Sequence, residues 1–488
     1  MFSRVSPRAR RWLYALLLLV LVAALVSFTR WAVLSHSLYE LNLRVKVLLR
    51  QMPVPAPKEK VLIFAPHEDD ETLGCAGYIQ QAIGAGADVK IVMMTNGEYP
   101  ETAVLLFEDT LRRGPEQFIQ LGYMRQRETL AAMKYLGLPT RNIAFLGYPN
   151  QYLNQMWLPK HWLPSDPVRS TRTRSTRSPY ANSMTPNAIY CGQSALQDVE
   201  TILMREKPDV VITLHPADIH MDHWPTYTFV RFALEELSLR GESFARDCHL
   251  YTYLIHRPYW PAPRGYHPKA DLQPPASLAA TRQTNWLYLS LTPDQTDRKH
   301  KATGLYRTQG GSIDPLMQAF SRSNELFGAL PDLMWPSEED VPMTPVAIDP
   351  IEDLYLGVRN PSADIITIQL ARKSGRMTVE INTHGNASKR IEYHACIHAV
   401  ETSSTKRIIA QYDWRGTKAA GTILKDDELE PVFPGSLAVH FAGTASILEA
   451  PWPMSDRAPG FFMIRTWTTR GGSMIDGTAT ATFKIPQR

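Results

Sequence analysis

The chain has 488 residues, of which 44% are hydrophobic and 20% are charged, and its formal net charge at pH 7 is +4. This length predicts two or three domains, because one hydrophobic core rarely serves so many residues. The weak positive charge argues against a dedicated nucleic-acid-binding protein, in which basic residues dominate one surface. The four scattered cysteines form no CxxC pair, which argues against a disulfide framework.

The N-terminal region contains an uncharged apolar run, residues 12–28, with an excess of arginine before it. Its length is close to that needed to cross a bilayer. The arginines predict a cytoplasmic segment at residues 1–11, a single-pass transmembrane anchor at 12–30 and a catalytic body outside the cytoplasm. A helical stalk and a Pro-rich linker are expected at 31–57. The alternative is a cleaved signal peptide, for which the apolar run is long and no A-x-A site follows.

From residue 58 onward, apolar strand-like runs alternate with helical patterns. Strands are expected at residues 61–64, 88–95, 142–146 and 210–214, and helices at residues 73–83, 125–136 and 194–206. Gly84 and Gly137 are placed to end the first two helices. This alternation predicts an α/β domain at residues 58–335, with a doubly wound, mostly parallel, Rossmann-like sheet.

Residues 151–190 interrupt this alternation and are rich in Trp, Pro, Ser and Arg. We expect a long loop beside the ends of the strands. One interpretation is a solvated, mobile surface loop. The other is a cationic wall, formed by arginines such as Arg172, for an anionic or glycan substrate.

The last part of the chain, residues 345–488, has a different pattern, in which short runs alternate apolar and polar residues. Strands are expected at residues 365–370, 377–381, 391–400, 408–414, 437–441, 461–468 and 478–485. This pattern predicts an antiparallel β-sandwich accessory domain. Trp414, Trp452 and Trp467 have two interpretations, stacking on sugar rings or packing in the sandwich core.

Two short segments, residues 65–71 and 215–223, concentrate His and carboxylate side chains directly after apolar runs. The carboxyl ends of strands in an open α/β sheet are where ligand and catalytic groups gather. Carboxylate oxygens and imidazole nitrogens together suit zinc or a similar divalent ion, and a catalytic zinc usually has three protein ligands. His67 and Asp70 can reach one ion, and a His from the second segment completes the set.

The remaining side chains of the two segments suit proton transfer. Asp69 is placed beside such an ion without having to bind it, and it can act as a general base. Of His220 and His223, one is expected to bind the ion while the other faces the substrate as a general acid or oxyanion stabiliser. Asp222 is expected to fix the tautomer of one of these two histidines. No G-x-G-x-x-G follows the first strand, and no Walker A or G-x-S-x-G motif occurs.

These motifs resemble those of the PIG-L/LmbE-like de-N-acetylase family. Residues 66–74, P-H-E-D-D-E-T-L-G, resemble the family's P-H-P-D-D-E signature, with Glu68 in place of a proline that binds no metal. Residues 220–223 match H-x-D-H, and residues 125–128 match R-x-x-E. The resemblance covers about residues 58–330.

The resemblance implies a zinc-dependent enzyme that removes acetyl from an N-acetylglucosamine-type sugar. The metal ligands that it implies are His67, Asp70 and His223. It implies Asp69 as the general base and His220 as the group that protonates the leaving amine or stabilises the oxyanion. Arg125 is implied to contact the sugar, and Asn150 occupies the position of an Asp that helps hold the sugar in relatives.

The sequence therefore predicts a membrane-anchored, metal-dependent deacetylase that acts on an N-acetylated glycan or glycoconjugate, with Zn²⁺ as the metal and Fe²⁺ as the alternative. A rival within enzymes is an amidase acting on another small glycoconjugate. A rival of another class is a non-catalytic glycan-binding surface protein with a vestigial metal site. No nucleic-acid partner is expected.

Overall fold

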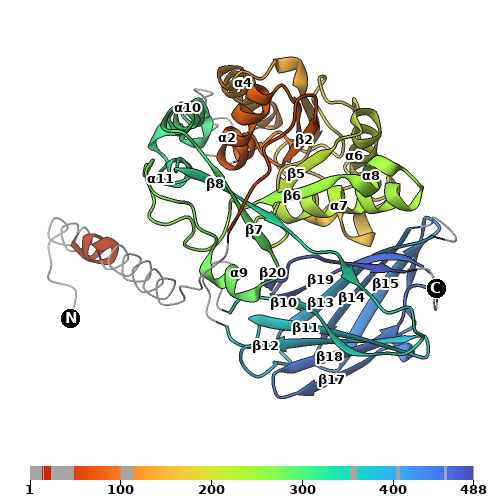
Figure 1. Cartoon of the computed structure of the whole chain (residues 1–488). Coiled ribbons are helices and arrows are strands. Elements are labelled where there is room, and N and C mark those ends of the chain that lie inside the picture. Colours follow the sequence, from red (N-terminus) through yellow and green to blue (C-terminus); the bar gives the residue numbers. More distant parts are fainter. Residues whose placement is uncertain are drawn as a thin grey trace, which may run out of the picture.

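A computed structural model describes residues 14, 16–23, 49–99, 114–351, 360–402, 407–455 and 459–486. About half of the predicted anchor at residues 12–30 lies outside this part of the chain, so the anchor stays a prediction. Within the residues described, no helix combines the length and the apolar character needed to cross a membrane. Figure 1 shows an α/β layer structure with a β-sandwich packed against one side of it.

The α/β part is built on an eight-stranded sheet with the order β1-β7-β8-β6-β5-β2-β3-β4. These strands are β1 (Arg50–Gln51), β2 (Lys60–Ala65), β3 (Asp88–Thr95), β4 (Ile143–Tyr148), β5 (Val210–Leu214), β6 (His249–Tyr253), β7 (Asn285–Ser290) and β8 (Asn324–Ala329). The sheet is mixed rather than wholly parallel, because β8 runs antiparallel to both β6 and β7. Within this sheet, the other pairings between described strands are parallel.

Helices cover both faces of this sheet. Helices α2 (Asp70–Ala85), α4 (Pro115–Leu136) and α10 (Pro293–Thr303) pack on one face, and α6 (Gly192–Glu206) and α7 (His223–Leu239) pack on the other. Successive residues of a strand point to opposite faces, so Ile63 belongs to the first core and Phe64 to the second. The strands are apolar along their length because both faces are covered.

The ends of helices α4 and α2 test the expectation that a glycine marks the end of a helix. Helix α4 ends at Gly137, as expected, with φ at 99°. Helix α2 continues past Gly84 and ends at Gly86, whose φ of 80° is the left-handed conformation that favours glycine at a helix end. The expected end at Gly84 was therefore two residues too early.

The C-terminal part consists of two antiparallel sheets around a common core. One sheet contains β10 (Val341–Ile348), β11 (Ile365–Lys373), β12 (Arg376–Thr383), β18 (Ala445–Pro451) and β17 (Ala438–Ala442). The second sheet is formed mainly by β16 (Glu428–Pro431), β15 (Lys418–Lys425), β14 (Arg407–Arg415), β13 (Glu392–Glu401), β19 (Gly460–Arg470) and β21 (Ala481–Ile485). Each of the seven expected strand regions contains a strand. Trp414 and Trp452 are buried in the core between the sheets, so sugar stacking by these two is wrong.

The second of these sheets packs directly on α7. Phe461 of β19 contacts Phe232 of α7, with ring centroids 5.0 Å apart. At the other end of the contact, the Arg465 guanidinium lies 3.8 Å from the ring centroid of Trp224. Residues of both parts therefore share one core, and the sandwich braces the helix that begins at His223.

Residues 151–190 are not a wholly solvated surface loop, because buried side chains alternate with exposed ones along the segment. The segment contains the short helix α5 (Leu153–Met156), and Trp157 and Trp162 are buried beneath α7 and the sandwich. The Tyr180 hydroxyl donates a hydrogen bond of 2.8 Å to Glu98. Of the arginines in the segment, Arg172 lies over the ring of Tyr99, 5.2 Å from its centroid.

Candidate active site

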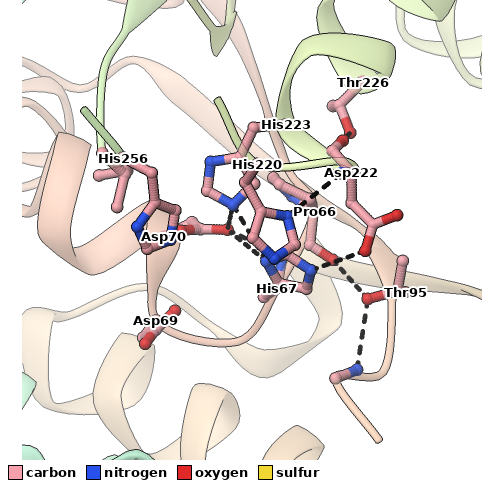
Figure 2. Close-up of polar contacts among 12 residues, drawn as sticks. Pro66, His67, Asp69, Asp70, Thr95, His220, Asp222, His223, Thr226 and His256 are labelled. Atoms are coloured by element: carbon pink, nitrogen blue, oxygen red, sulfur yellow. Dashed lines mark hydrogen bonds and ion pairs between the residues drawn. The ribbon is translucent and has the colours of Figure 1, made fainter. Parts of the chain in front are cut away.

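The side chains of the two sequence motifs meet at one edge of the sheet. His67, Asp69 and Asp70 follow β2, and His220 and His223 follow β5. The loops after β3, β4 and β6 begin at the same edge, because the carboxyl ends of parallel strands lie side by side. Figure 2 shows the histidine rings gathered around the carboxylate of Asp70.

Three of these side chains bring one ligand atom each to a common point. His67 Nδ1 lies 3.1 Å from His223 Nε2 and 3.2 Å from Asp70 Oδ2, and His223 Nε2 lies 3.3 Å from Asp70 Oδ2. In a tetrahedral zinc site with bonds of about 2.0–2.2 Å, neighbouring ligand atoms lie about 3.3–3.6 Å apart. Two imidazoles and one carboxylate at these distances fit a divalent ion that keeps one position open for other ligands.

The outward-facing nitrogens of the two ligand rings are held by carboxylates. His67 Nε2 lies 3.0 Å from Asp222 Oδ2, and His223 Nδ1 lies 3.1 Å from Asp218 Oδ2. Such carboxylate partners fix the tautomer and orientation of a metal-binding histidine. The expectation that Asp222 would orient His220 or His223 is therefore wrong in detail, because its carboxylate contacts His67. His220 instead accepts, through Nδ1, the backbone N–H of Asp222 at 3.1 Å.

Asp69 stands apart from the three ligand atoms. It precedes α2 with φ at 134°, a sparsely populated conformation for a residue other than glycine. Strain of this kind costs about 1–3 kcal/mol and clusters at functional sites. Burial raises the pKa of Asp69 well above its ordinary value, and the neighbouring Asp70 and Glu71 raise it further. The carboxyl group is thus separate from the ligand set and is made more basic than an exposed aspartate.

The histidines of the site differ in charge. Burial lowers the pKa of His67, but hydrogen bonds to Asp222 and Asp70 outweigh it and raise the pKa to about 9. Burial, together with the charges of His67 and His223, lowers the pKa of His220 well below its ordinary value. His220 is therefore neutral at pH 7.

A cavity of about 250 Å³ opens onto this cluster. The residues that line it are His67, Asp69, Asp70, Leu73, Tyr99, Arg125, Asn150, Gln151, His220, Ile255, His256, Gln309, Asp314, Leu316 and Met317. The cavity therefore brings together the side chains singled out in the sequence except Asp222 and His223, which are fully buried.

Arg125 and Asn150 present unused hydrogen-bonding atoms at this cavity. Arg125 donates through Nη1 to the carbonyl oxygen of Gly97, while its Nε and Nη2 are buried without a hydrogen-bond partner. The side-chain oxygen of Asn150 also has no partner. Buried polar groups are usually hydrogen-bonded, so these atoms are available to a polar ligand.

Sequence reasoning missed His256, Gln151 and Asp218. The His256 ring lies 4.8 Å, centroid to centroid, from that of His223. His256 lies three residues after the end of β6, so recognition of that strand would have placed it at the same sheet edge as the two motifs. Asp218 lies within the second segment, but no spacing rule assigned it to His223.

Comparison with known proteins gives the following matches. Residues 62–234 match the family model described as "PIG-L: GlcNAc-PI de-N-acetylase". A curated relative, 1D-myo-inositol 2-acetamido-2-deoxy-alpha-D-glucopyranoside deacetylase of Kribbella flavida, is 33% identical over 96 residues, or 20% of this chain. The chain spans 30% of the length of that relative.

The matches among solved structures have low sequence identity and TM-scores below 0.5. The N,N'-diacetylchitobiose deacetylase of Pyrococcus horikoshii is 20% identical with a TM-score of 0.31, over 51% of this chain and 70% of that one. The 4-carboxy-2-hydroxymuconate hydratase GalB of Pseudomonas putida is 14% identical with a TM-score of 0.33, over 54% of this chain and 83% of that one. At these TM-scores the likeness carries no argument about activity. The family match and the two motifs that it spans identify residues 62–234 of this chain as a PIG-L family domain.

Proposed function

We propose that this chain is a metal-dependent deacetylase that hydrolyses the N-acetyl group of an N-acetylglucosamine-type sugar. The observation that carries the proposal is the convergence of His67 Nδ1, Asp70 Oδ2 and His223 Nε2 at mutual distances of 3.1–3.3 Å beside a cavity. The PIG-L match and the deacetylase named as its curated relative support the same activity.

His67, Asp70 and His223 are the residues that hold the ion. A divalent ion bound there supplies Lewis acidity, which polarises a carbonyl group and makes water more acidic. Zn²⁺ fits a donor set of two imidazoles and one carboxylate, and Fe²⁺ is the alternative.

The other side chains handle protons and orientation. Asp69, whose raised pKa suits a general base, accepts a proton from the water that attacks the amide carbon. As the C–N bond breaks, the amine nitrogen receives the proton that Asp69 took from the water. His220 faces the cavity, and because its Nδ1 accepts the backbone N–H of Asp222, its Nε2–H is the group that stabilises the oxyanion. Arg125 and Asn150 hydrogen-bond the sugar through the atoms that have no partner in the protein. Acetate and a free amino sugar are the products.

The natural substrate that we propose is a glycan or glycoconjugate outside the cytoplasm. This part rests on the sequence of residues 12–30 and its flanking arginines, which favour a single-pass anchor with the catalytic body outside. Partition of the full-length protein into the membrane fraction, with protease access to the catalytic part from the outer side, tests it. Recovery in the soluble cytoplasmic fraction would contradict it.

The test of the activity is acetate release from N-acetylglucosamine oligomers by the purified full-length protein. The protein is assayed as isolated, after chelation and after zinc is restored, with Asp69→Ala as the control. Activity that chelation removes, zinc restores and the control lacks supports the proposal. A full equivalent of bound metal without acetate release would favour an amidase with another substrate. Absence of both would favour a glycan-binding protein.

A further inference from the structure

The residues that line the cavity include two chemically different groups. Its polar side chains include Tyr99, Arg125, Asn150 and Gln151, which come from α4 and from the loops after β3 and β4. We call these four residues the polar wall. Its aliphatic side chains are Leu73, Ile255, Leu316 and Met317. We call these four residues the apolar wall.

The apolar wall adjoins the candidate metal ligands. Leu73 lies in the first turn of α2, three residues after Asp70, and side chains at this spacing share one face of a helix. Ile255 directly precedes His256, whose ring nitrogen lies within 4.8 Å of ligand atoms of Asp70 and His223. Aliphatic surface therefore begins next to the position where an amide carbonyl has to sit for hydrolysis.

The outer part of the apolar wall is held firmly by its own segment. Leu316 and Met317 lie in α11 (Pro315–Gln318), and their backbone N–H groups donate to Asp314 Oδ1 at 2.6 and 3.3 Å. The segment before α11 is tied to α4, because the backbone N–H of Thr308 donates to Glu128 at 3.0 Å. Met317 is 3% exposed and also packs in the main core.

An N-acylated amino sugar has a matching division of chemistry. Its ring carries hydroxyl groups that need hydrogen-bond partners, which the polar wall offers. Its acyl chain is apolar beyond the carbonyl carbon and gains by leaving water for an aliphatic surface. The distribution of side chains therefore favours one orientation of the substrate at the ligand cluster.

Building on the proposed function, we propose that the apolar wall binds the acyl group of the amide and that Met317 limits the length of the acyl chain that is accepted. Both residues of α11 lie beyond residues 62–234, so this specificity comes from outside the matched family region. One methylene more or less in an apolar pocket changes the specificity constant by about 10–200-fold.

The experiment compares kcat/KM for N-acetyl-, N-propionyl- and N-butyrylglucosamine oligomers, followed by the release of free amine. In Met317→Ala full-length protein, the butyryl-to-acetyl ratio of kcat/KM is expected to rise by about tenfold or more. Leu316→Ala is the second variant, because Leu316 is only partly buried and its removal is less damaging to the core. Ile313→Ala is the matched control: it lies in the same segment but is 85% exposed, so its ratio should stay at the wild-type value.

Binding is measured separately from turnover. Calorimetry with the Asp69→Ala protein should give tighter binding of the butyryl compound once Met317→Ala is added. A raised ratio in either α11 variant, with Ile313→Ala unchanged, supports the inference. Folded variants that cleave all three substrates with the wild-type ratio would overturn it while leaving the deacetylase intact. A wild-type protein that cleaves none of the three would overturn both.

Discussion

Asp222 contacts the outward nitrogen of His67, with 3.0 Å between Oδ2 and Nε2, and this contact turns His67 Nδ1 toward Asp70 and His223. The same carboxylate accepts the backbone N–H groups of Gln151 at 2.5 Å and Leu153 at 3.0 Å. One buried side chain thus positions both a candidate metal ligand and the loop that carries part of the polar wall.

We predict that Asp222→Asn weakens zinc binding by about 10–100-fold, the usual effect of removing a carboxylate partner from a metal-binding histidine. Competition with a zinc chelator of known affinity measures the change. Asp247→Asn, an exposed aspartate with 67% of its side chain accessible, is the control and should bind zinc like the wild type. Equal affinity in Asp222→Asn and the wild type would show that the contact does not orient the ligand.

Asp69→Asn should separate chemistry from metal binding. Its carboxylate is outside the set of three ligand atoms, so we expect a full equivalent of bound zinc in the variant. Loss of a general base typically lowers kcat by about 10²–10⁴-fold. Metal analysis and the rate of acetate release, measured on the same preparation, check the two expectations. A variant that has lost its zinc would identify Asp69 as a ligand rather than a base.

Zinc should stabilise the fold as well as enable activity. The ligand cluster buries Asp70 and His223 side by side, and an ion that binds only the folded protein raises its stability by mass action. At a free concentration about 1,000 times the dissociation constant, the gain is about 4 kcal/mol. Thermal unfolding followed with and without added zinc should therefore show a rise in Tm. Asp70→Asn, which retains the side-chain size, should show a much smaller rise; an equal rise would place the ion elsewhere.

The parts of the site that sequence could predict are those in which short-range spacing dictates geometry. His67 and Asp70 follow one strand and lie on one turn, so their convergence needs only the strand and the helix that were recognised. The partner of Asp222 was mispredicted because the contact with His67 joins residues 155 positions apart, and its direction depends on how two loops pack.

In the fold, too, local patterns could be predicted from the sequence, whereas contacts between distant segments could not. The alternation of apolar runs predicted the α/β layers and seven of the sandwich strands, since burial on both faces or on one face leaves its period in the sequence. It did not reveal β10, β15, β16 and β18. The antiparallel direction of β8 could not be predicted, because an apolar run does not show which way a strand runs in the sheet. Residues 151–190 were expected to form a long loop beside the ends of the strands, and their sequence did not show that Trp157 and Trp162 fill the space between α7 and the sandwich. That space exists only once the two parts meet.

His398 makes the contact between the sandwich and the α/β part sensitive to acid. Its ring stacks on Trp157, with centroids 3.7 Å apart, and its Nε2 donates to the Trp157 carbonyl oxygen at 2.7 Å. Burial lowers the pKa of His398 to about 3, against its ordinary value of 6.5. The unfolded chain therefore takes up a proton as the pH falls below 6.5, whereas the folded chain does so only near pH 3.

Between these two values this histidine makes the free energy of unfolding fall by about 1.4 kcal/mol per pH unit. We expect His398→Gln to be less stable than the wild type at pH 7.5 but to lose less stability between pH 7.5 and pH 5. Urea unfolding at the two pH values measures the difference. Buried histidines elsewhere, such as His215, titrate in both proteins and cancel in the comparison. His440→Gln, in which the exposed ring of His440 is replaced, should keep the wild-type slope. Equal slopes for His398→Gln and the wild type would mean that His398 is protonated in the folded protein, and that its contact with Trp157 is stable when charged.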